Sequence, residues 1–235
     1  VTFANRSTDK LSLVGKNVDV DENNIVAQEL KADATNTATL TNLTYTGALK
    51  GNSVLDSAGG RLTLSGGSYT GNTNLKGTTV NMAVTSHTGD VTVQGTTVGI
   101  NGGTYTGGLT LAGTSVSVSG VAFDGENKVH NLTLSGLGEN GAVTVNNSIV
   151  TGADDVVLKG KTVNVSQSGN TRANWTAETF TLGKGESASN NTTRLTNINL
   201  TVTKENTTPT VENDVVLTLN NAAISAPKIN LTPAS

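Results

Sequence analysis

The amino-acid sequence predicts an all-β protein, a parallel β-helix (β-solenoid) whose coils hold about 18 residues and three short strands each. Three observations lead to this fold. Columns of like residues align when the chain is shifted by about 18 positions, apolar and polar residues alternate within each unit, and glycines recur where the alternation stops. The clearest columns are Tyr69, His87, Tyr105 and Phe123; Leu62, Val80, Val98 and Val116; and Gly71, Gly89, Gly107 and Gly125.

The unit at residues 91–107 illustrates how one coil forms. Apolar and polar residues alternate over 91–93 and again over 98–100, and 104–106 makes a short third strand. Glycines between these segments supply the backbone freedom that tight corners need. Stacked coils would pair their strands in parallel about 4.8 Å apart, around a core too thin to need many large side chains. A thin core accounts for a hydrophobic content of 34% and an aromatic content of 3%.

We expect a single domain over residues 1–235, because no linker-like segment divides the chain. The regular coils are clearest at 62–125. Extra residues near 126–131 and 137–142 fall at corners, where loops lengthen without disturbing the strands, and both loops are secondary candidates for binding. After about residue 175 the repeat weakens and prolines enter, so irregular or capping coils are expected there.

The composition excludes several classes of partner and cofactor. Charged residues make up 14% of the chain and the net charge is -3, with no basic patch, so nucleic acid is not an expected partner. The lack of cysteine excludes disulfides and thiolate metal sites, and no apolar run is long enough for a transmembrane helix. No cofactor, metal site or catalytic residue is expected. The chain starts at Val1 without a methionine, which predicts a processed product or an excised fragment.

Two short motifs carry a resemblance to a known class of proteins. Gly-Thr-Thr-Val at 77–80 is followed by Ser-His-Thr-Gly at 86–89, and Gly-Thr-Thr-Val at 95–98 is followed by Thr-Tyr-Thr-Gly at 104–107. They resemble the passenger domains of autotransporter adhesins and of filamentous-haemagglutinin-like exoproteins, most clearly over 62–120. The resemblance implies a right-handed β-helix at the surface of a Gram-negative bacterium or outside it, secreted by the type V route. Contact with a membrane would be made only through a barrel or anchor that this sequence lacks. A left-handed hexapeptide helix would also suit an 18-residue coil, but the strict six-residue apolar repeat is missing.

We therefore expect an adhesin module that binds through repetitive Thr, Ser and Asn faces. If the aromatic column points inward, the hydroxyls beside it point outward in files. Each hydrogen bond would contribute only about 1 kcal/mol, but a ladder repeats the contact on every coil. The partner is expected to be a second copy, in cell aggregation and biofilm formation, or a glycan or protein of the host surface. The predicted binding residues are Thr70, Thr88, Thr106, Thr92 and Thr110.

Three alternative functions stay open. A β-helix enzyme acting on polysaccharide needs two carboxyls that face one groove, whereas acidic groups such as Asp154 with Asp155 look local and unrepeated on adjacent coils. An ice-binding solenoid needs a longer threonine array than one that stops at Ala122 and Asp124. A passive structural stalk would bind nothing.

Two single residues have competing interpretations. His87 stands in a column of Tyr and Phe, so we expect a packed member of that column in place of a metal ligand or base. Trp175 lies outside the clear columns. We expect it to pack a loop against the flank of the solenoid, and an exposed binding aromatic is the alternative.

Overall fold

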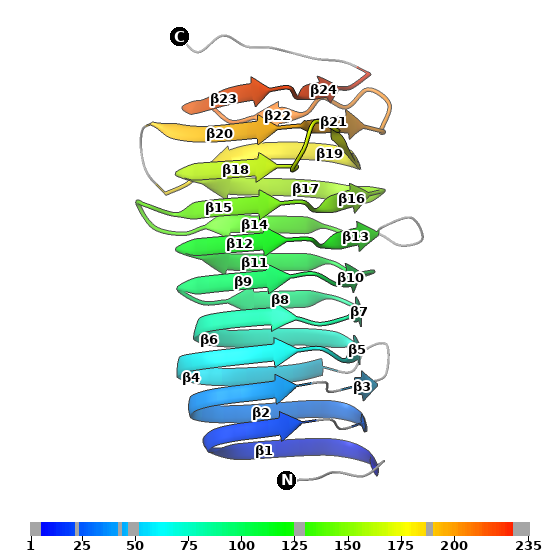
Figure 1. The fold of residues 1–235 in the computed structure, drawn as a ribbon, viewed down its shortest axis with the longest axis vertical. Coiled ribbons are helices and arrows are strands. Elements are labelled where there is room, and N and C mark those ends of the chain that lie inside the picture. The colour runs from blue at the N-terminus through cyan, green and yellow to red at the C-terminus, as the bar shows by residue number, and fades with distance from the viewer. Residues whose placement is uncertain are drawn as a thin grey trace.

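The structure is a computed structural model of the chain, and it describes residues 6–21, 24–41, 44–46, 52–124, 130–186 and 190–227. Within these ranges the protein is all-β and contains no helix, as the sequence predicts. All the strand pairs are parallel, and the strands follow one another around a common axis as in a parallel β-solenoid (Figure 1). The first strand, β1, and the last, β24, lie at opposite ends of the tube (Figure 1).

The strands form three faces of the tube. The first face contains β8 (Val91–Gln94), β11 (Leu109–Gly113), β14 (Leu132–Gly136), β17 (Ala153–Gly160) and β22 (Thr210–Val211). The second face contains β9 (Thr97–Asn101), β12 (Ser115–Ser119), β15 (Ala142–Asn146), β18 (Thr162–Ser166), β20 (Asn191–Thr196) and β23 (Val215–Asn220). The third face contains β3 (Thr44–Thr46), β5 (Ser68–Thr70), β7 (Ser86–Thr88), β10 (Thr104–Tyr105), β13 (Ala122–Asp124), β16 (Ile149–Thr151), β21 (Ile198–Val202) and β24 (Ala223–Ser225).

Longer strands bend around corners and contribute to more than one face. They are β1 (Arg6–Asp21), β2 (Asn24–Thr41), β4 (Asn52–Ser65), β6 (Asn72–Ala83) and β19 (Ala173–Lys184). Parallel pairing continues past residue 175, because β19 pairs with β21 and β20 pairs with β23.

The register explains the columns seen in the sequence. Val98 of β9 pairs with Val116 of β12, and hydrogen-bonded residues on neighbouring coils of this region lie 18 positions apart. From β12 to β15 the separation of equivalent residues rises to 27, as between Val121 and Ser148. The corner between β14 and β15, at residues 137–141, holds part of this insertion, as predicted. Residues 126–129 of the other predicted loop lie outside the described part of the chain.

Inward-pointing side chains stack into continuous columns. Leu75, Val93 and Leu111 of the first face pair in sequence, and each is buried. Along the third face the aromatic column continues beyond the repeat that the sequence reveals. Its buried members are Tyr69, His87, Tyr105, Phe123, Val150, Trp175 and Leu200. Burial of each large apolar side chain contributes about 1.5–3 kcal/mol, so these columns hold the coils together.

His87 is a packed member of the aromatic column, which confirms the sequence interpretation. Its ring lies between those of Tyr69 and Tyr105, with centroids 6.2 Å away on both sides and planes tilted by 7° and 9°. The imidazole Nε2 lies 2.8 Å from the Thr73 hydroxyl, which is also buried. Burial lowers the pKa of His87 from about 6.5 to about 4, although the Gly89 backbone and Asp90 oppose this shift.

Corner residues stack as closely as the core. A Cβ atom added to Gly107 would lie 1.8 Å from the backbone oxygen of Gly89, one coil earlier, so this column has room only for glycine. At the corner between the second and third faces the backbone is left-handed. Glycine occupies it at Gly102 and Gly120, with φ of 70° and 64°, and asparagine occupies it at Asn147 and Asn197, with φ of 50° and 55°. Asparagine is one of the few residues with a side chain that tolerates this conformation.

Replacing Gly107 by alanine should separate the central coils. The added Cβ would overlap backbone atoms of Gly89, which cannot turn away as a side chain can. We expect the free energy of unfolding, measured by chemical denaturation, to fall by about 3 kcal/mol. Gly99→Ala is the matched control, because its nearest contact is the flexible Asn81 side chain at 3.0 Å. Equal stability of the two variants would contradict this account of the corner.

The buried His87 should make the fold sensitive to acid. As the pH falls below 6.5, the unfolded chain binds a proton that the folded chain does not bind until about pH 4. Stability present at pH 7 should therefore be lost between these values, by roughly 3 kcal/mol from this group. The double variant His87→Phe with Thr73→Val removes both buried polar groups together, and it should lose less stability over this pH window. Identical pH dependence of unfolding in the two proteins would show that His87 does not contribute.

Candidate binding faces

The predicted binding threonines lie on two separate faces. Thr70, Thr88 and Thr106 stack in one outward file on the third face, whereas Thr92 and Thr110 stack in a file on the first face. Thr110 is exposed and the other four are partly buried. The structure therefore brings together three of these residues in one place and two in another, and the five do not form a single site.

Hydroxyls on the third face bond partly to one another. Thr106 Oγ1 donates to Thr88 Oγ1 at 3.4 Å, and Ser86 Oγ donates to Ser68 Oγ at 3.0 Å. A hydroxyl has one proton to donate and two lone pairs, so each such bond uses part of its capacity for a ligand. The threonine file ends where β13 begins, because the next outward residue is Asp124.

The first face gains charged residues toward the C-terminal end. Lys159 Nζ lies 3.1 Å from Glu212 Oε1, and Lys184 Nζ lies 3.8 Å from Asp214 Oδ2. The backbone N–H of Lys184 also donates to Glu212 Oε2 at 3.0 Å. These contacts attach the segment around β22 to β17 and β19, so the charges serve the packing of the last coils.

The second face was not singled out from the sequence. It carries no charge at the outward positions of five consecutive strands, and it presents three such positions on each strand. We call it the neutral face. Its outward residues, from β6 to β18, are Thr79, Asn81, Ala83, Thr97, Gly99, Asn101, Ser115, Ser117, Ser119, Ala142, Thr144, Asn146, Thr162, Asn164 and Ser166. Arg61 of β4 and Arg194 of β20 mark its two ends.

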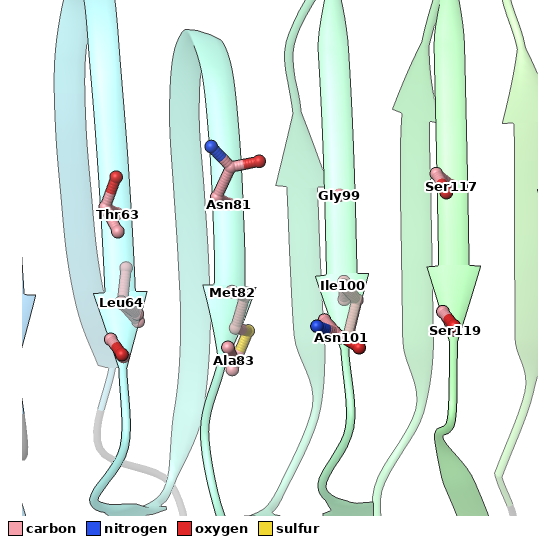
Figure 2. A pocket seen from close by; sticks show the side chains of 11 residues that line it. Thr63, Leu64, Asn81, Met82, Ala83, Gly99, Ile100, Asn101, Ser117 and Ser119 are labelled. Atoms are coloured by element: carbon pink, nitrogen blue, oxygen red, sulfur yellow. The ribbon is translucent and has the colours of Figure 1, made fainter.

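A shallow depression of about 460 Å³ lies on the neutral face over β4, β6, β9 and β12 (Figure 2). It exists because Gly99 has no side chain and Ala83 has a short one. Asn81 projects from the neighbouring strand beside Gly99, and its Oδ1 lies 3.0 Å from the place a Cβ would take (Figure 2). Glycine and alanine at outward positions of two successive units were the sequence signal that could have located it.

Carboxylates on adjacent coils do come together, which corrects the sequence expectation that acidic groups are unrepeated. Ala153 pairs with Ala177 and Asp155 pairs with Thr179, so Asp154 lies beside Glu178. The sequence missed this pair because the two residues are separated by a spacing other than 18.

Two carboxylates of this region, Glu178 and Asp155, each accept a hydrogen bond from a neighbouring side chain. Lys204 Nζ donates to Glu178 Oε2 at 2.9 Å, and the Thr179 hydroxyl donates to Asp155. The hydrogen bond to Glu178 and the charges of Glu178, Asp155 and Asp154 raise the pKa of Lys204. Among the described residues no group of three or more His, Cys, Asp or Glu is placed to hold a metal ion.

The corner at residues 137–141 contacts a second corner. The backbone N–H of Gly138 donates to Glu186 Oε2 at 2.9 Å, and Leu137 is 42% exposed. This predicted secondary binding loop is thus braced by a segment two strands further along the second face.

In the part of the chain that the structure describes, there is no helix long and apolar enough to cross a bilayer.

Trp175 lies in the core, which corrects the expectation that it packs on the flank. Its side chain is fully buried, and its indole Nε1 donates to the backbone oxygen of Ser148 at 2.9 Å. It pairs with Leu200 on the next coil and so takes a place in the third-face column. The alternative of an exposed binding aromatic is also wrong.

Comparison with protein-family models, with curated protein sequences and with solved structures found no match to this chain.

The burial of Trp175 makes a direct optical test possible, since it is the one tryptophan of the chain. We expect blue-shifted fluorescence that acrylamide hardly quenches in the folded protein, because the indole has no access to solvent. Unfolding in denaturant should shift the emission to the red and raise the quenching constant severalfold. Strong quenching without denaturant would place the indole at the surface instead.

Proposed function

We propose that this protein is an adhesin module of the secreted or cell-surface type, and that it adheres to copies of itself on other cells. In this proposal the chain is a right-handed β-helix, as its resemblance to autotransporter passenger domains implies, with about 18 residues in each regular coil, as the sequence repeat indicates. It has no catalytic role. Cell aggregation and biofilm formation would be the outcome, and a host glycan or protein is the alternative partner.

The observation that carries the proposal is the repetition of outward Thr, Ser and Asn side chains on successive strands. Ser117 of β12 follows Gly99 of β9 and is followed by Thr144 of β15 in the same file. The predicted binding residues Thr70, Thr88 and Thr106 repeat in the same way on the third face, and Thr92 and Thr110 on the first. Few proteins outside the solenoids place the same polar group at equal intervals on a rigid surface.

Repetition supports adhesion because weak contacts add up when they are made together. One exposed hydrogen bond contributes about 1 kcal/mol, which is too little to hold two proteins. A rigid row of such groups makes the later contacts within one complex, where the effective concentration is high. Many copies on two surfaces multiply the effect again, so that the bond between cells is strong while each protein pair separates easily.

The direct test is clumping of beads coated with the purified protein. Beads that carry it should aggregate, and an excess of the soluble protein should prevent the aggregation by occupying the faces. Beads coated with an unrelated protein of similar net charge are the control.

If the coated beads stay dispersed, self-adhesion is wrong. Binding of the same beads to a panel of host glycans and matrix proteins would then support attachment to a host. No clumping and no binding would identify a passive stalk.

A further inference from the structure

The three faces of the tube are unequal as surfaces for contact between two copies. That two copies adhere at all is taken from the proposed function. When two copies meet through the same face across a two-fold axis, a charged residue near the axis meets its own copy, and one farther out loses water without gaining an opposite charge unless the face supplies one. Like charges in such a contact are unfavourable. The first face carries Lys159 and Lys184, and the third carries Asp124. The neutral face offers three outward positions without charge on each of five consecutive strands of the described chain, between Arg61 and Arg194.

The neutral face is also wider than the third face. Its strands β9, β12, β15 and β18 have five residues each, so each presents three outward positions. Strands of the third face in the same coils, such as β7 and β10, have three and two residues.

We propose that the neutral face is the contact between two copies of this chain, and that its depression over Gly99 is the centre of that contact. The two copies would be related by a two-fold axis that lies in the plane of the contact, parallel to the strands and midway between β6 and β9, where Asn81 pairs with Gly99. Such an axis places Asn81 of each copy over the Gly99 of the other, where the missing side chain leaves room (Figure 2). Both copies have the same spacing of about 4.8 Å between strands, so the flanking rows come into register as well.

A second copy fits this surface better than a charged partner does. The amide of Asn81 and the hydroxyls of Thr63 and Ser117 around the depression both donate and accept hydrogen bonds, so they are complementary to themselves. A charged partner would find no opposite charge among the outward residues of the neutral face, which begins at Thr79 and ends at Ser166. The net charge of -3 lies elsewhere on the molecule and does not oppose the contact directly.

The expected size of the contact predicts its strength. Four strands of five residues, with about 4.8 Å between strands and about 3.3 Å per residue, cover roughly 300 Å² on each copy. Stable pairs bury about 800 Å² on each partner. The protein should therefore sediment as a monomer in dilute solution, and it should aggregate only when many copies are held on one surface.

The test uses single substitutions at the centre of the depression. Gly99→Lys and Gly99→Glu both fill it and place like charges across the two-fold axis. Gly99 has ordinary strand backbone angles and only the flexible Asn81 side chain nearby, so both variants should fold. Beads coated with either variant alone should clump at least about fivefold less than wild-type beads. Mixing Lys-variant beads with Glu-variant beads should restore clumping to within about twofold, because opposite charges then meet.

Thr133→Lys, at an outward position of β14 on the first face, is the matched control for added charge, and it should leave clumping within about twofold of wild type. Thr88→Lys tests the third face as the competing contact. If the Gly99 variants clump like the wild type while Thr88→Lys does not, the third face is the contact and this inference is overturned, although self-adhesion stands. Failure of the mixed beads to clump would also overturn it, because the lost adhesion would then not come from charges facing each other. Wild-type beads that never clump would refute self-adhesion itself and the neutral-face contact with it.

Discussion

The parallel stacking of each coil on the next constrains the inward and corner residues of this protein. An inward residue must match the residue above it in size and polarity, as Leu75, Val93 and Leu111 do. A corner residue must leave space for the next corner: a Cβ on Gly95 would lie 2.6 Å from the Gly77 oxygen. Only outward side chains escape this matching, so they are the positions where composition is free to serve binding.

Where the spacing between coils is constant, this constraint is visible in the sequence. The aromatic column from Tyr69 to Phe123 and the glycine corners could be predicted because each member lies 18 positions from the last. Beyond Phe123 the interval changes, since Phe123 pairs with Val150 and Trp175 follows on the next coil. A fixed shift cannot align residues across unequal insertions. The core position of Trp175 and the neighbouring positions of Asp154 and Glu178 were missed for this reason.

The faces were harder to rank from sequence than the core. Threonine and serine favour strands and keep a surface soluble, so their presence in a column does not distinguish a binding row from a solvated one. What separates the faces is how many outward positions each strand presents and where charges interrupt the files. The second depends on register, because Arg61 and Arg194 stand at the ends of the neutral face only through the pairing of β4 with β6 and of β20 with β18.

The proposed adhesion through a polar, uncharged face is compatible with solubility. An apolar face of the same extent would bind its copies by water exclusion and would risk irreversible aggregation. Hydroxyls and amides such as those of Asn101 and Ser119 are hydrated when the protein is alone, so forming the contact exchanges one set of hydrogen bonds for another. The net gain per contact is then small, and the proposed adhesion would depend on the number of copies engaged. Because the outward residues do not support the core, the strength of adhesion can change by substitution on this face while the columns beneath keep the fold.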